Sequence, residues 1–78
     1  MKTAEEINNI FSYHPPKKGQ CEIYEAIREK AKEFAVFINQ VCPDSREKSI
    51  SFTSLENSVF WANASIARNG HAVAYETH

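Results

Sequence analysis

The sequence predicts an all-α fold, in which a short N-terminal helix precedes a long antiparallel helical hairpin that assembles as a homo-oligomer. Few residues interrupt the helices, since the 78 residues contain only two glycines and three prolines. Apolar residues recur at intervals of three and four along two long stretches, as they do in amphipathic helices. A chain of this length also buries too little surface to be stable without a partner or a staple. We expect one domain over residues 1–78, with helices at about 3–10, 20–42 and 45–69, and we assign no function to the tail at 70–78.

The first helix is expected from a capping-box pattern. Thr3 is followed three residues later by Glu6, and in this arrangement the two side chains satisfy free backbone N–H groups at the helix start. The helix should end near Ile10. The segment 11–19 contains two consecutive prolines, which favour an extended backbone, and ends on Gly19, which permits a turn. We therefore expect a structured loop before the hairpin.

The two helices of the hairpin are expected to face each other through apolar stripes. The stripe of the first consists of Ile23, Ile27, Ala31, Phe34, Ile38 and Val41. The stripe of the second consists of Phe52, Leu55, Val59, Ala62 and Ile66. Pro43 breaks the chain between them, Asp44 or Ser45 can cap the second helix, and Gly70 is its expected stop. Two long helices joined by a tight turn form an antiparallel hairpin.

Other large apolar residues lie outside these stripes and predict assembly. Trp61 lies on the side of its helix opposite Val59, and Phe37 flanks the stripe of the preceding helix. A monomer would expose Trp61, Phe60 and Phe37 together, and contiguous apolar patches of this kind mark interaction surfaces. We expect these three residues at an oligomer interface. In the alternative, the short N-terminal helix folds back over Trp61 and the protein stays monomeric.

Charge and cysteine content exclude several classes of function. A net charge of −1 provides no broad positive field for long nucleic acid. No apolar run approaches the ~20 residues that span a bilayer, and the acidic N-terminal segment does not resemble a signal peptide. Cys21 and Cys42 lie at the two ends of one expected helix, about 30 Å apart, too far for a disulfide within one chain. We expect reduced thiols and a cytoplasmic protein.

Catalysis and metal binding are not expected. The three histidines lie in the loop and in the tail, without the spacing of a metal motif. A nucleophile–base pair of Cys21 and His14 is conceivable, but an ordinary thiol at a helix start explains Cys21 better. The sequence therefore favours a binding protein that has no metal and no cofactor.

A set of polar and aromatic residues is the candidate site: Tyr13, His14, Arg28, Arg68 and Asn69. A nucleotide needs a flat surface on which its base stacks and a cation that meets its phosphate. Tyr13 supplies the first, and Arg28 or Arg68 supplies the second through a planar guanidinium.

A second interpretation of this set needs no ligand. Tyr13 would cover the hydrophobic core, and the two arginines would form surface ion pairs with Glu25, Glu29 or Glu56. The residue pattern alone favours this interpretation over a binding site.

Longer motifs add a resemblance that covers the chain from about Thr3 to Asn69. They are Phe11-Ser12-Tyr13-His14-Pro15-Pro16, then Gln20, Tyr24 and Ile27-Arg28, then Cys42-Pro43-Asp44-Ser45-Arg46-Glu47, then Leu55-Glu56 and Trp61-Ala62-Asn63-Ala64-Ser65-Ile66-Ala67-Arg68-Asn69. In these motifs the chain resembles the phage anti-CBASS cyclic-oligonucleotide sponge family, whose helical-hairpin domain is shared with a Thoeris anti-defence sponge.

The resemblance implies a phage-encoded hexamer that acts in the host cytoplasm. It would sequester cyclic dinucleotides, such as cyclic GMP-AMP, and cyclic trinucleotides, such as cyclic tri-AMP, unaltered and in separate pockets between subunits. By the same resemblance, Tyr13 and Arg28 would bind the dinucleotide, and His14, Arg68 and Asn69 the trinucleotide. An adenosine-diphosphate-ribose-type ligand is less expected, because the Thoeris relative carries additional sequence for it. The alternative function is a hairpin that binds a host or virion protein through its Trp61 and Phe37 surfaces.

Overall fold

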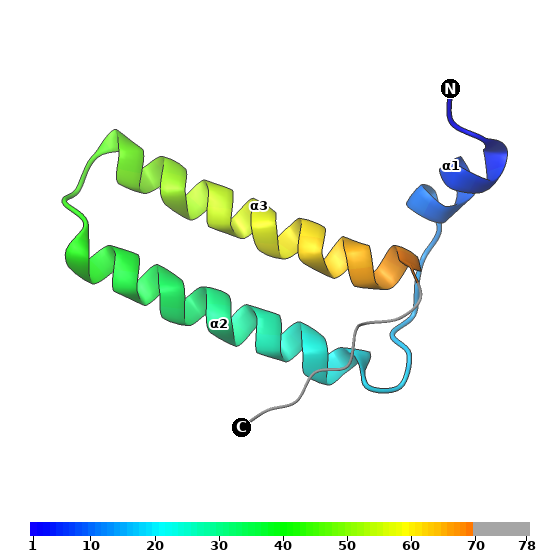
Figure 1. The fold of residues 1–78 in the computed structure, drawn as a ribbon, viewed down its shortest axis with the longest axis horizontal. Coiled ribbons are helices and arrows are strands. Elements are labelled where there is room, and N and C mark those ends of the chain that lie inside the picture. The colour runs from blue at the N-terminus through cyan, green and yellow to red at the C-terminus, as the bar shows by residue number, and fades with distance from the viewer. Residues whose placement is uncertain (70–78) are drawn as a thin grey trace.

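The computed structural model describes residues 1–69, which form three α-helices and no strand: α1 (Ala4–Phe11), α2 (Gln20–Val41) and α3 (Arg46–Asn69). Helices α2 and α3 run antiparallel and pack against each other, and α1 lies beyond the end of the hairpin where α3 ends and α2 begins (Figure 1). The predicted all-helical hairpin is therefore confirmed. The expected helix ends agree with the observed ones to within one residue, and Thr3, Cys42 and Ser45, which were placed inside the helices, are flanking residues. The tail and the expected stop at Gly70 lie outside the described residues.

The start of α1 is held by the predicted capping box. The hydroxyl of Thr3 accepts a hydrogen bond from the backbone N–H of Glu6 at 3.1 Å, and the carboxylate of Glu6 accepts one from the backbone N–H of Thr3 at 3.5 Å. These bonds satisfy two backbone donors that the helix itself leaves free. The N-terminal boundary of α1 is thus encoded locally by two residues.

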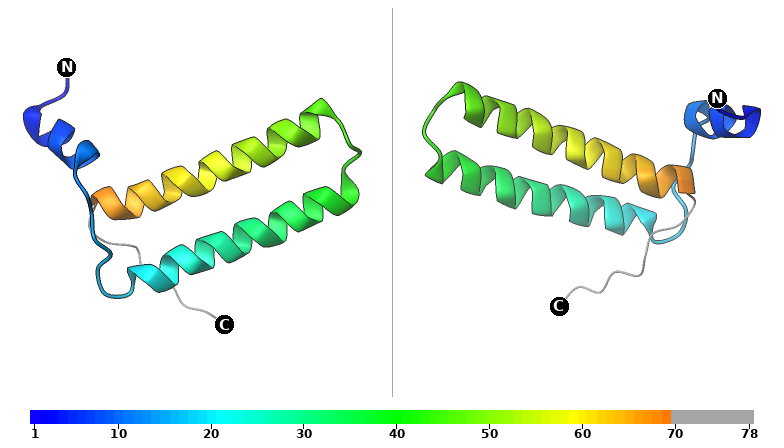
Figure 2. Two further views of the ribbon diagram at one scale, coloured as in Figure 1. Left: turned by 180° about the vertical axis from the view of Figure 1, so that it is seen from behind. Right: turned by 45° about the horizontal axis from the view of Figure 1, so that its top comes forward.

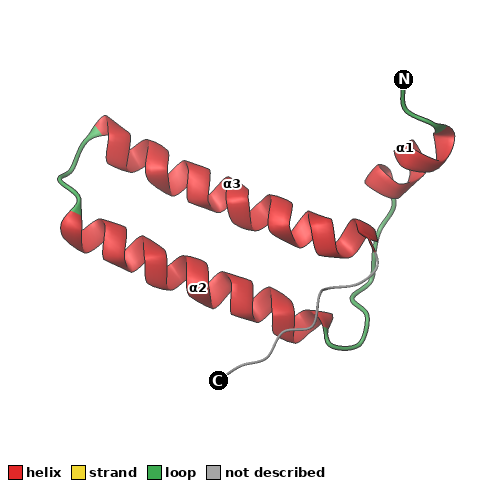
Figure 3. Ribbon diagram, viewed as in Figure 1, coloured by secondary structure: helices red, strands yellow, loops and turns green. Residues whose placement is uncertain are grey.

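The loop between α1 and α2, green in Figure 3, is fixed where it enters α2. Gly19 has a φ of 84°, a left-handed conformation that glycine adopts without steric cost. Gln20 is buried, and its side-chain oxygen accepts a hydrogen bond from the backbone N–H of Lys17 at 2.8 Å. The backbone N–H of Gln20 in turn donates to the carbonyl of Lys17 at 3.0 Å. The turn is therefore closed by reciprocal hydrogen bonds between two residues.

The turn between α2 and α3 is closed by Ser45 and Lys48. The hydroxyl of Ser45 accepts from the backbone N–H of Lys48 at 3.1 Å and caps α3, while Asp44 pairs with the Lys48 ammonium at 2.9 Å. The same ammonium donates to the backbone carbonyl of Asn39 at 3.1 Å. Lys48 is buried. Its ammonium satisfies the Asn39 carbonyl near the C-terminus of α2, where the helix dipole favours positive charge.

Substitution Lys48→Met is expected to lower the free energy of unfolding by about 1–3 kcal/mol, because the Asn39 carbonyl loses its charged donor. Methionine retains much of the apolar side chain, so packing changes little. Urea denaturation measures the loss. Asp44→Asn is the control, and its effect should be smaller because the Asp44 side chain is fully exposed. Equal losses in both variants would contradict the role assigned to the bond with Asn39.

The hydrophobic core of the hairpin is thin. Among residues 1–69, Ile38 is the only hydrophobic residue that is buried, with 8% of its surface exposed. The five stripe residues of α3 are half-buried, as are Ile23, Ile27 and Ala31 of α2. The prediction was wrong for Phe34 and Val41, which are 54% and 58% exposed. At ~100° per residue these two lie about 40° and 60° to one side of Ile38 around the helix, whereas the half-buried Ala35 lies about 60° to the other side.

The hairpin is a single layer with apolar side chains on its surface. Its principal-axis extents are 46 × 37 × 16 Å, and Figure 2 shows α1 beyond the end of the two long helices, where it does not cover their faces. Trp61, Phe37 and Phe60 are 59%, 57% and 61% exposed. The alternative in which α1 folds over Trp61 is therefore wrong for this chain. The surfaces that sequence analysis assigned to an oligomer interface are uncovered.

Candidate functional site

Three pockets contain the predicted arginines, and the largest of these three lies between α1 and the end of α3. This α1–α3 pocket has a volume of about 710 Å³. Its lining is polar and consists of Thr3, Glu5, Glu6, Asn8, Asn9, Ser12, His14 and Arg68. The fold thus brings together His14 and Arg68, two of the three residues expected in one site.

His14 is held in the α1–α3 pocket by α1. Its ring is half-buried, and Nε2 lies 2.7 Å from the backbone carbonyl of Asn9. Because a carbonyl only accepts, Nε2 carries the hydrogen of this bond. The other ring nitrogen, Nδ1, is then the polar atom with which His14 can meet a ligand.

Arg68 enters the pocket from the last turn of α3 and lies against Trp61. Its guanidinium carbon is 5.6 Å from the centroid of the Trp61 ring, a cation–π contact. The Trp61 ring in turn meets Phe60 edge-to-face, with centroids 5.3 Å apart. Arg68 forms no ion pair within the described part of the chain, although Glu5 and Glu6 line the same pocket. Its guanidinium is therefore held by the Trp61 ring and not by a carboxylate of the described residues.

Asn69 is placed differently from its two expected partners. Its side-chain amide donates to the backbone carbonyl of Ser65 at 2.7 Å, one turn earlier in α3. It is not among the residues that line the α1–α3 pocket. The amide of Asn69 stabilises the end of α3 in this conformation, and its assignment to the trinucleotide site stays a prediction.

The second pocket lies along the seam of α2 and α3 and has a volume of about 430 Å³. This seam pocket is lined by Tyr24, Arg28, Phe60, Asn63, Ala64 and Ala67. Asn63 has a buried side-chain oxygen that finds no hydrogen-bond partner in residues 1–69. Sequence reasoning missed Tyr24 and Asn63 as pocket residues. The signal was present, because an asparagine interrupts the small and apolar run from Trp61 to Ala67.

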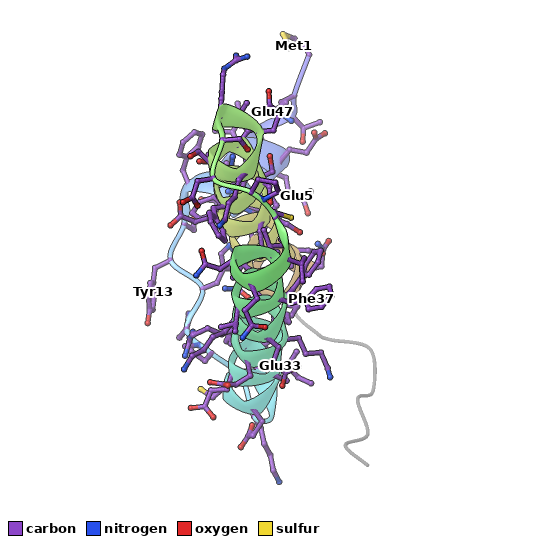
Figure 4. The ribbon with its side chains drawn as sticks, turned by 90° about the vertical axis from the view of Figure 1, so that its left-hand side faces the viewer. Met1, Glu5, Tyr13, Glu33, Phe37 and Glu47 are labelled. Atoms are coloured by element: carbon purple, nitrogen blue, oxygen red, sulfur yellow. The ribbon has the colours of Figure 1, made fainter. Side chains whose placement is uncertain are left out.

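Tyr13 lies apart from Arg28. It is 82% exposed and projects from the hairpin on the side opposite Phe37 (Figure 4). The interpretation in which Tyr13 covers the core is therefore wrong. Neither of the two pockets that Arg28 lines includes Tyr13. The expected pairing of these residues in one site is not formed by a single chain.

The proposed ion pairs of the arginines are also not formed. Lys48 and Asp44 make the only ion pair within residues 1–69, so Arg28 does not pair with Glu25 or Glu29 there. Both cysteines are free thiols. Over the same residues, no group of three potential ligands could hold a metal ion, and no helix has the length and apolar content to cross a membrane.

The described residues form a single-layer helical hairpin with exposed apolar side chains and with arginines that line its pockets. This arrangement defines a small binding domain. The chain belongs to the Acb2/Tad1 hairpin-domain family, whose model matches residues 3–67. Membership confirms the resemblance read from the motifs and implies a phage anti-defence sponge, a binding domain rather than an enzyme. Comparisons with curated proteins and with solved structures find no match. Arg68 and Asn69 lie just beyond the matched residues.

Proposed function

We propose that the protein is a phage sponge that binds cyclic di- and trinucleotides, holds them uncleaved in the host cytoplasm, and so prevents activation of CBASS effectors. The observation that carries this proposal is the α1–α3 pocket, in which His14 lies together with Arg68, an arginine that forms no ion pair within residues 1–69. A planar guanidinium that has no carboxylate partner suits phosphate oxygens. The family of the chain supports binding rather than catalysis.

Trinucleotide binding requires more than one copy of the α1–α3 pocket. In one chain, the carboxylates of Glu5 and Glu6 line the pocket beside a single arginine. This local excess of negative charge does not favour binding of an anion. A cyclic trinucleotide carries one phosphate per nucleotide around a ring. A homo-oligomer with a symmetry axis presents one Arg68 per subunit around that axis, so that each phosphate meets its own arginine. His14 and Asn69 would contact the same ring.

Dinucleotide binding is proposed between subunits for a different reason. Tyr13 is almost fully exposed and does not meet Arg28 within its own chain. A tyrosine of one subunit placed over the seam pocket of another would stack on a base, while Arg28 met a phosphate. Each ligand would then be enclosed by at least two chains.

Assembly through the exposed apolar surfaces completes the proposal. The chain buries one hydrophobic residue of the described sequence and exposes Trp61, Phe37 and Phe60. Covering these side chains would contribute about 25 cal/mol for each Å² of apolar surface removed from water. We propose a homo-oligomer, a hexamer by analogy with the family that the motifs resemble.

The test is isothermal titration of the purified protein with cyclic di- and trinucleotides, with a linear dinucleotide as control. Tight binding of the cyclic forms at fewer than one ligand per chain is expected. Mass spectrometry of the ligand released by denaturation should find it intact. Linear products would instead place the protein among phosphodiesterases, and no heat with any cyclic form would refute the sponge proposal.

The exposed aromatic surface favours a second candidate function, a hairpin that binds a host or virion protein. In that case Trp61 and Phe37 would be free in the isolated protein, which would be monomeric by light scattering. Cyclic nucleotides would not bind. A stable oligomer that binds them refutes this alternative.

A further inference from the structure

We propose that Trp61 is a positioning residue for anion binding, because its indole holds the Arg68 guanidinium at the α1–α3 pocket and away from the carboxylates of α1. This inference rests on the proposed function. From the sequence, Trp61 was expected only at an oligomer interface. The geometry adds a second role, since Arg68 lies over the Trp61 ring at 5.6 Å and lines the pocket at the same time.

The contact follows from the position of the two residues in one helix. Arg68 is seven residues after Trp61, which is about two helical turns, so the two side chains share a face of α3. An arginine in the last turn of a helix would otherwise extend into solvent with many rotamers. The flat indole face restricts these rotamers, because the guanidinium stacks on it through cation–π attraction.

The competing partners of Arg68 make this restriction important for binding. Glu5 and Glu6 line the same pocket, and Glu6 already accepts hydrogen bonds from Thr3 in the capping box. An ion pair of Arg68 with Glu5 would neutralise the charge that a phosphate needs. In the structure Arg68 is stacked on Trp61 and forms no ion pair within residues 1–69. The indole therefore keeps the cation available without neutralising it.

The position of Trp61 also links assembly to binding. The ring is 59% exposed, and it meets the Phe60 ring edge-to-face. A subunit that covered Trp61 would fix the ring, and through it the guanidinium. Ligand binding should then be strongest in the assembled protein, and the arginine should be positioned before the ligand arrives.

The first experiment compares Trp61→Met, Trp61→Phe and Phe37→Leu by titration with cyclic tri-AMP and cyclic GMP-AMP. Trp61→Met keeps apolar volume but removes the ring, so trinucleotide affinity should fall about three- to tenfold relative to dinucleotide affinity, the size expected of a cation–π contact. Trp61→Phe keeps a ring and should restore most of the loss. Phe37→Leu alters an equally exposed aromatic residue, 57% exposed, and should leave the ratio of the two affinities unchanged.

All titrations use concentrations at which light scattering shows the wild-type oligomer. The proposal would be overturned if Trp61→Met lowered the trinucleotide and dinucleotide affinities in parallel, or changed their ratio as Phe37→Leu does. Trp61 would then have an interface role alone. Failure of Trp61→Phe to restore the ratio would do the same.

The second experiment needs no ligand and separates this inference from the proposed function. Trp61 is the only tryptophan of the chain, so intrinsic fluorescence reports its surroundings. Arg68→Gln should change the emission of the ligand-free protein, while Arg46→Gln, an exposed arginine at the other end of α3, should not. Identical emission of Arg68→Gln and wild type would show that the contact is absent in solution. If the wild type bound no cyclic nucleotide, the proposed function would fail, and this comparison would still decide whether Trp61 holds Arg68.

Discussion

Replacement of Tyr13 by alanine is expected to lower the affinity for cyclic dinucleotides about ten- to a hundredfold, because stacking of a base on an aromatic ring contributes about 1–3 kcal/mol. The fold should not change, since the Tyr13 side chain is 82% exposed and packs on no core. Assembly should also persist if Tyr13 acts on the ligand. Titration with cyclic GMP-AMP measures the loss, and light scattering measures the oligomer.

Two further variants show whether the loss is specific to the ring of Tyr13. Tyr13→Phe keeps the stacking surface and should retain most of the affinity. Phe11→Ala removes an aromatic side chain that is equally exposed, at 82%, two residues earlier in the chain. It should leave dinucleotide binding unchanged. Dissociation of the oligomer in Tyr13→Ala would make Tyr13 an assembly residue instead of a ligand-binding one.

The sequence predicted the helices closely because their boundaries depend on local chemistry. The Thr3–Glu6 box and the Ser45 hydroxyl each act within three residues, so the pattern that encodes them is visible without a structure. The helical period likewise depends only on spacing. The same spacing does not determine which side of an apolar stripe faces the partner helix. For this reason Phe34 and Val41 were placed in the core, although they are exposed.

Features that depend on the tertiary arrangement could not be read from the sequence. The burial of Lys48 follows from the way the turn brings its ammonium to the Asn39 carbonyl of the neighbouring helix. A lysine in a polar helix start gives no sign of this. Similarly, glutamine usually lies at the surface, but Gln20 is buried. Its side chain is held at the end of the loop by the hydrogen bond from the backbone N–H of Lys17.

The candidate site was predictable only in part. Tyr13, His14, Arg28 and Arg68 were recognised by residue type and by family motifs, yet residue type does not tell which of them meet. The fold places α1 beside the end of α3 and so joins His14 to Arg68. Tyr24 and Asn63 were missed as pocket residues because their residue types do not tell that both side chains meet in the seam of α2 and α3.

Arg68→Gln is expected to weaken binding of cyclic tri-AMP more than a hundredfold. A hydrogen bond to a charged group contributes about 1.5–3 kcal/mol, which corresponds to roughly ten- to a hundredfold in affinity, and each phosphate of the ring would lose its own arginine. Dinucleotide affinity should change little, because Arg68 does not line the seam pocket. Arg46→Gln removes the same charge from the exposed start of α3 and is the matched control.

Arg68→Lys separates the charge of Arg68 from its geometry. Lysine keeps the positive charge but lacks the planar guanidinium that binds two phosphate oxygens and stacks on Trp61. Its affinity for the trinucleotide should lie between those of wild type and Arg68→Gln. A lysine variant that binds as tightly as wild type would show that charge alone is needed, and that the stacking over Trp61 at 5.6 Å has no part in binding. A glutamine variant with unchanged affinity would remove Arg68 from the site altogether and assign the phosphates to other cations of the assembly.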